Sequence, residues 1–126
     1  MFSNEVLYYA STKPDKLASP TTSLASKFVT ITWNVTPNDH KRPVTSYLVK
    51  LKAKNNTFVT ETNICNGALS TVVTNTKCTA LMSLFTTNLG LAINDLIVVT
   101  VAATNVMGTS LDSDPNVDGI IAKKFP

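Results

Sequence analysis

The sequence is poor in the residue types that most catalytic and metal sites need. Its 126 residues include one histidine, two cysteines and four glycines. The histidine, His40, lies in a turn-like run beside Asp39 and Lys41. No serine or cysteine lies in a nucleophile-elbow motif, no glycine-rich loop could hold phosphate, and no Cys-x-x-Cys or His–Cys spacing suggests zinc. We therefore predict a protein that is not an enzyme, with no catalytic residues, no metal and no cofactor.

Long hydrophobic runs and strong charge are also missing. No apolar stretch reaches the ~18–20 residues of a membrane span, and the first twenty residues show no signal-peptide pattern. The net charge is only +3, with 15% charged and 44% hydrophobic residues. Lys50, Lys52 and Lys54 share one face of an expected strand but have no aromatic residues between them, which favours a solvated face over a nucleic-acid surface. We expect one globular domain with no nucleic-acid partner and no membrane span.

What the chain does contain is alternation of apolar and polar residues. A two-residue period is typical of strands that bury one face. Short alternating runs are separated by turn residues, without a helical apolar stripe, and this combination predicts an all-β, antiparallel two-sheet sandwich. Trp33 should be the main aromatic anchor of its core. The inward positions are Val29, Ile31, Trp33 and Val35; Tyr47, Val49 and Leu51; and Ile97, Val99, Val101 and Ala103.

Three of these runs resemble the fibronectin type III family. Residues 103–108 fit the pattern A-x-N-x-x-G, Trp33 matches the tryptophan of the second strand, and residues 43–51 fit P-x-x-x-Y-x-V-x-L. The resemblance covers roughly Leu17 to Ala122. It implies a fibronectin type III or immunoglobulin-like sandwich, from a large tandem-repeat surface or extracellular protein. One departure is Ile97, where the family usually has a tyrosine.

Two cysteines flank a turn signal in the middle of the chain. We expect strands over residues 57–64 and 78–84, with Asn66-Gly67 as a two-residue hairpin turn. Cys65 and Cys78 lie on either side of that turn. We predict a disulfide between them, which would place the protein in an oxidising compartment. The alternative is two free, buried cysteines.

Two N-glycosylation sequons, Asn34-Val35-Thr36 and Asn55-Asn56-Thr57, point to the same compartment. Asn34 lies on the strand face opposite Trp33, and Asn55 lies at a turn, so both side chains should be accessible. We therefore count N-linked glycans among the expected partners and predict an extracellular or cell-surface location.

A run of acidic residues near the end resembles the start of a calcium-binding loop. Asp114, Asn116 and Asp118 alternate before a glycine, and Asp112 could add a fourth side chain. However, the twelfth position is Phe125 instead of glutamate, and no helices are expected around it. We interpret the run as a polar turn before the last strand, with calcium binding left open.

The two ends of the chain resemble each other. Aligning residues 1–14 with 113–126 pairs Asn4 with Asn116, and the tyrosines Tyr8 and Tyr9 with Ile120 and Ile121. Residues 4–10 have strand character and are set off by the prolines at positions 14 and 20. We therefore expect residues 1–14 to be the closing strand of a preceding module plus a linker, 15–122 the sandwich, and 123–126 a linker to a following module.

These features predict a structural module without chemistry, stacked with neighbouring copies or modules in a linear array or fibre. Tyr8 and Tyr9 would pack on the neighbour. If residues 4–10 instead formed the first strand of the same domain, the chain would be a self-contained monomer. Two other functions stay open: an extracellular binding or adhesion module that recognises glycan, protein or calcium through its loops, and an intracellular scaffold with reduced cysteines.

Overall fold

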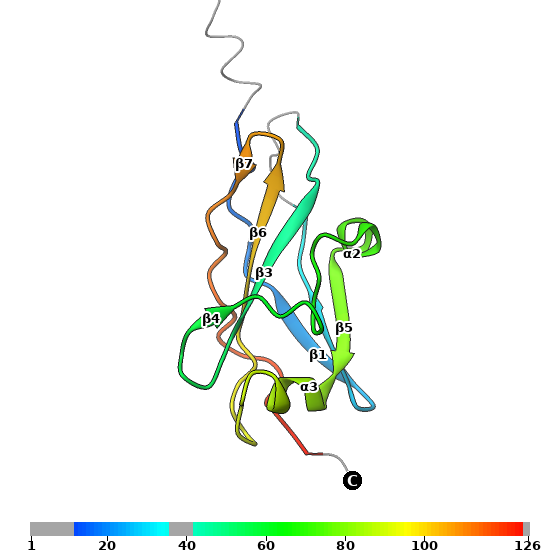
Figure 1. Ribbon diagram of the computed structural model, residues 1–126, viewed down its shortest axis with the longest axis vertical. Helices are drawn as coiled ribbons and strands as arrows, with labels where there is room; N and C mark the ends of the chain where they lie inside the picture. Colours follow the sequence, from blue (N-terminus) through cyan, green and yellow to red (C-terminus); the bar gives the residue numbers. More distant parts are fainter. Residues whose placement is uncertain (1–11, 36–41, 125–126) are drawn as a thin grey trace, which may run out of the picture.

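Two antiparallel sheets face each other in the computed structural model, which describes residues 12–35 and 42–124 (Figure 1). The three-stranded sheet has the order β1-β2-β5, and the four-stranded sheet has the order β4-β3-β6-β7. This arrangement confirms the predicted sandwich. The first sheet contains β1 (Thr21–Ala25), β2 (Phe28–Thr32) and β5 (Lys77–Leu81); the second contains β3 (Ser46–Lys52), β4 (Phe58–Val59), β6 (Val99–Asn105) and β7 (Gly108–Thr109).

Strand β6 lies in the middle of the larger sheet. It pairs with β3 from Leu51↔Val99 to Ser46↔Thr104, and its last residues pair with β7. Six of its seven residues are buried. The strand was predicted to begin at Ile97, two residues before β6 does. Ile97 is nevertheless buried, and its N–H donates to the carbonyl of Ile120, 3.0 Å away.

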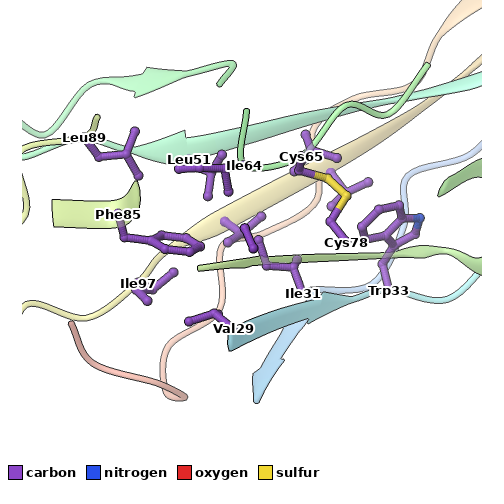
Figure 2. Close-up of a cluster of buried hydrophobic side chains, with 14 of the residues drawn as sticks. Val29, Ile31, Trp33, Leu51, Ile64, Cys65, Cys78, Phe85, Leu89 and Ile97 are labelled. Carbon is purple, nitrogen blue, oxygen red and sulfur yellow. A yellow bond between two sulfur atoms is a disulfide. The ribbon is translucent and has the colours of Figure 1, made fainter. Parts of the chain in front are cut away.

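The core lies between the sheets and is filled from both (Figure 2). Trp33, just past the end of β2, is 3% exposed, as the sequence predicted. Its indole meets the Tyr47 ring edge-on, with ring centroids 5.2 Å apart. Phe85 is also fully buried, and Figure 2 shows its ring directed into the space between the sheets. Aromatic and branched aliphatic side chains thus form one continuous core: Val29, Ile31, Trp33, Val49, Leu51, Phe85, Val99 and Val101.

Two short helices interrupt the strands expected after β4. Strand β4 has only two residues, and the strand expected over 78–84 ends at Leu81. The chain continues instead as α3 (Met82–Thr87), while α2 (Ser70–Asn75) precedes β5. Each helix has six residues, too few to show a repeated 3.6-residue apolar stripe in the sequence. No helix within 12–35 and 42–124 is long and apolar enough to cross a membrane.

The hairpin predicted at Asn66-Gly67 is wrong. A type I′ turn needs positive φ at both central residues, and neither residue has one. Instead, the Asn66 side chain accepts the N–H of Ala68 at 3.0 Å, and the chain turns into α2. A Cβ atom at Gly67 would overlap the carbonyl oxygen of Tyr47, whose N–H donates to the Gly67 carbonyl at 2.9 Å. The glycine is required by close backbone contact with β3.

A two-residue hairpin turn joins β1 and β2. Ala25 pairs with Phe28 across a two-residue loop, in which Ser26 has a φ of 56°. Before β1, the stretch between the two prolines packs on the sandwich, because Pro14, Leu17 and Pro20 are all buried. This stretch therefore lacks the exposure of a linker.

The burial of Trp33 leads to a stability prediction. Trp33→Ala should lower the free energy of unfolding by ~3–5 kcal/mol, because it removes a large buried side chain and leaves a cavity. Urea unfolding followed by circular dichroism measures the change. Val35→Ala is the matched control. Val35, which the alternating pattern wrongly placed inward, is 68% exposed, so its substitution should cost no more than ~0.5 kcal/mol. Equal effects of the two substitutions would contradict the placement of Trp33.

Candidate functional site

A disulfide joins Cys65 to Cys78, and both residues are buried. Their Cα atoms are 5.4 Å apart. Cys65 lies in the loop before α2 and Cys78 in β5, so the bond ties this loop to the first sheet. Figure 2 shows it beside the Trp33 and Ile31 side chains. By the loop-entropy estimate, closing such a loop stabilises the fold by ~3 kcal/mol.

Both sequon asparagines that we predicted to be accessible are exposed. Asn34 follows Trp33 directly, although Thr36 of its sequon lies outside the described residues. Asn55 lies in the turn between β3 and β4. Its Oδ1 accepts two hydrogen bonds from Thr57, one from the backbone N–H at 3.2 Å and one from the hydroxyl at 2.6 Å. The asparagine and threonine of this sequon are therefore held together on the surface.

The four candidate calcium ligands do not converge. Asp112 accepts a hydrogen bond from Lys50 at 3.0 Å, and Asp114 accepts one from Lys16 at 2.9 Å. Asn116 is buried and bonds to backbone instead. Within residues 12–35 and 42–124, no three His, Cys, Asp or Glu side chains lie close enough to hold a metal ion. Asp112 and Asp114 thus form separate surface ion pairs instead of sharing an ion.

The same segment has a different role, which the sequence analysis missed. Three buried side chains, spaced three residues apart, accept hydrogen bonds from alternate N–H groups of β6. Ser110 Oγ accepts from Ala103 at 3.0 Å, Ser113 Oγ from Val101 at 3.0 Å, and Asn116 Oδ1 from Val99 at 2.7 Å. We call Ser110, Ser113 and Asn116 the side-chain ladder. The only sequence signal for it is the spacing S-x-x-S-x-x-N directly after the strand.

Asn105, at the other end of β6, connects several segments at one end of the sandwich, which we call the β6–β7 pole. Its Oδ1 accepts the N–H of Met107 at 2.8 Å, which closes the turn to β7. Its Nδ2 donates to the carbonyls of Thr12 at 3.0 Å and Arg42 at 3.5 Å. The asparagine of the A-x-N-x-x-G pattern therefore connects three segments: the β6–β7 turn, the start of the described chain at Thr12 and the loop before β3 at Arg42.

The opposite pole carries an apolar groove of about 560 Å³. Met82 and Leu91 are buried in it, whereas Leu81 and Ile93 are 37% and 48% exposed. The charged residues that line the groove are all lysines: Lys27 from the β1–β2 turn, and Lys123 and Lys124 from the end of the described chain.

Asp95 fixes the loop on one side of this groove. Its carboxylate accepts the Ala92 N–H at 2.8 Å and a hydrogen bond from Lys54 at 3.1 Å. These two bonds, the backbone one foremost, lower the pKa of Asp95 below its usual value. Since Lys50 and Lys54 both pair with carboxylates, the lysine face predicted on β3 is partly neutralised.

Comparisons with known proteins bear on the fold. No family model and no curated protein matches the chain. Among solved structures, the titin fragment A168–A170 matches 90% of the chain at 22% identity, with a TM-score of 0.65. The twitchin kinase region of C. elegans matches 83% at 17% identity, with a TM-score of 0.59, and a myokine matches 85% at 17%, with a TM-score of 0.53.

The fold is fibronectin type III-like. The chain spans 34% of the titin fragment and 16% of the twitchin structure, but 97% of the myokine. In the kinase-containing structures the likeness lies in the flanking domains. His40, Tyr8 and Tyr9 lie outside the described residues.

The side-chain ladder generates a second stability prediction. Ser113→Ala removes the side-chain acceptor of the buried Val101 N–H and should lower the free energy of unfolding by ~1–3 kcal/mol. Asp114→Ala is the matched control in the same segment, because its side chain is 77% exposed and its surface ion pair contributes little. Urea unfolding of both variants checks the difference. A Ser113→Ala variant as stable as Asp114→Ala would show that the ladder has no energetic role.

Asp95 generates a pH prediction. Because its pKa is lowered in the folded state, its charge stabilises the fold fully above the unfolded pKa of ~3.9. This contribution is lost as the pH falls through the lower, folded pKa. The melting temperature of Asp95→Asn should therefore lie below that of the wild type at pH 7, and the gap should narrow toward pH 3. Melting curves across this range test it, and a gap independent of pH would contradict it.

Proposed function

We propose that the chain is a non-enzymatic structural module of an extracellular or cell-surface repeat protein, arranged with its neighbours in a linear array. One observation carries the proposal: the described chain starts at one pole of the sandwich and ends at the other (Figure 1). Thr12 is bonded to Asn105 beside the β6–β7 turn. Ala122 exchanges hydrogen bonds with Asn94 and Asp95 at the far pole. Such modules can follow one another in one direction.

The comparisons support an arrayed module in a further way. The titin fragment comprises the domains A168–A170, and the chain spans about a third of it. We propose module boundaries at residues 15 and 122, with residues 1–14 and 123–126 leading to the preceding and following modules. Of these residues, Thr12 and Pro14 already contact the sandwich. Tyr8 and Tyr9 would then contact a neighbouring copy or module.

The extracellular part of the proposal depends on the disulfide and the sequons. Disulfides persist mainly in oxidising compartments, and this one is buried in the core. The exposed Asn55, held beside Thr57, offers a glycan acceptor on the same molecule. Neither feature is needed by an intracellular scaffold with reduced cysteines.

The alternative function is a binding or adhesion module. The apolar groove with its lysines favours it, because ligand sites are concave and mostly apolar, with a few polar groups. Calcium recognition by the segment from Asp112 to Asp118 is not favoured, since Asp112 and Asp114 pair with lysines and Asn116 bonds to the backbone.

The compartment can be tested on protein isolated from its native source. Alkylation before reduction should leave Cys65 and Cys78 unlabelled, and both should label after reduction. Peptide mapping with and without glycan removal should find N-glycan on Asn55, with Asn34 read in the same experiment. Labelling of either cysteine before reduction, with bare asparagines, would favour the intracellular scaffold.

A further inference from the structure

The groove at the α3 pole has the surface chemistry of a docking site. We call it the α3-pole groove; Leu81, Met82, Leu91 and Ile93 supply its apolar surface. Leaving Leu81 and Ile93 partly in water is unfavourable, in proportion to their exposed apolar surface. An occupant that covered both side chains would remove this cost. The occupant must therefore offer apolar or aromatic side chains.

The rim adds a charge requirement. Lys27, Lys123 and Lys124 are all exposed around the groove, and no acidic side chain is among the described residues that line it. Neutralising this cluster favours an occupant with negative charge and without lysine or arginine. Chemically, the groove fits a mostly apolar peptide that carries a carboxylate.

The chain itself contains such a peptide. Residues 1–11 read Met-Phe-Ser-Asn-Glu-Val-Leu-Tyr-Tyr-Ala-Ser, with Glu5 as their one charged side chain. This segment has several large apolar and aromatic side chains, unlike a polar, flexible linker: Phe2, Leu7, Tyr8 and Tyr9. Aromatic side chains are also the commonest anchors of interfaces.

Geometry argues that the segment reaches a second copy. Thr12 is fixed to Asn105 at the β6–β7 pole, and β6 alone separates that pole from the groove by ~20 Å. Tyr8 and Tyr9 precede Thr12 by three or four residues, which span at most ~14 Å when extended. The backbone of Tyr8 and Tyr9 therefore ends short of the groove of its own copy, which favours a neighbouring copy.

We propose that residues 1–11 of one copy dock in the α3-pole groove of the preceding copy, with Tyr8 and Tyr9 on Leu81 and Ile93 and Glu5 facing the lysines. This deepens the proposed function, on which it rests, by naming the contact between neighbours. Direct contact of the two poles is less favourable, because Lys13 and Arg42 are exposed at the β6–β7 pole and would face the lysine rim. The contact is heterologous, so it propagates from copy to copy.

Two complementary variants of the full chain test the proposal. The double variant Tyr8→Ser with Tyr9→Ser keeps its groove but loses its docking segment. Ile93→Glu keeps its docking segment but loses its groove. In sedimentation velocity, the average mass of the wild type should rise with concentration. Each variant alone should stay monomeric, with its apparent dissociation constant raised about tenfold or more. Their equimolar mixture should form dimers and nothing larger.

Controls separate docking from misfolding. Val117→Glu places the same charge on a residue that is 88% exposed and does not line the groove, and it should assemble as the wild type does. Lys123→Glu with Lys124→Glu should weaken assembly, and adding Glu5→Lys should restore it. Melting curves and intact disulfides verify that each variant is folded.

Several results would overturn the docking proposal. They are a wild type that stays monomeric at all concentrations, assembly of either variant alone at wild-type strength, or a mixture that remains monomeric. Binding of decanoate to a monomeric wild type, lost in Ile93→Glu, would assign the groove to an acyl chain instead. None of these results changes the thiol and glycan readout of the proposed function, so the two can fail separately.

Discussion

The outer edge of β6 is the constraint on which much of this structure depends. Val99, Val101 and Ala103 have no exposed surface, so their N–H groups need protein acceptors, and leaving one unpaired costs ~1–3 kcal/mol. The side-chain ladder provides these acceptors where a regular last strand would use carbonyls. The closing segment is thereby fixed along the sandwich, and the chain is carried from the β6–β7 pole to the α3 pole.

Much of the fold could be predicted, because burial on one face imposes a two-residue period. That period identified β2, β3 and β6 and the burial of Trp33. The helices could not be found in this way, since six residues of mixed polarity leave no helical pattern. The hairpin predicted at Gly67 was wrong for another reason. A glycine next to asparagine suggests positive φ, but here the missing side chain makes room for the Tyr47 carbonyl.

The sites were predictable to different degrees. The cysteine pair needed only two residues and a plausible separation in sequence. The acidic run misled because alternate carboxylates have the same sequence pattern whether they surround an ion or pair with separate lysines. The α3-pole groove left no local signal at all. Its lining comes from three distant parts of the chain, at positions 27, 81–93 and 123–124, which only the folded sandwich brings together.

The position of the disulfide has a mechanical consequence. When the two poles are pulled apart, tension follows the backbone, and the 13 peptide steps from Cys65 to Cys78 amount to ~45 Å of extended chain. The bond holds those Cα atoms 5.4 Å apart, so tension bypasses the loop and α2 within it. As long as the disulfide is oxidised, most of this length therefore cannot extend, even after the two sheets separate. Reduction of the disulfide frees this length, so the redox state of the surroundings determines how far the stretched domain can lengthen.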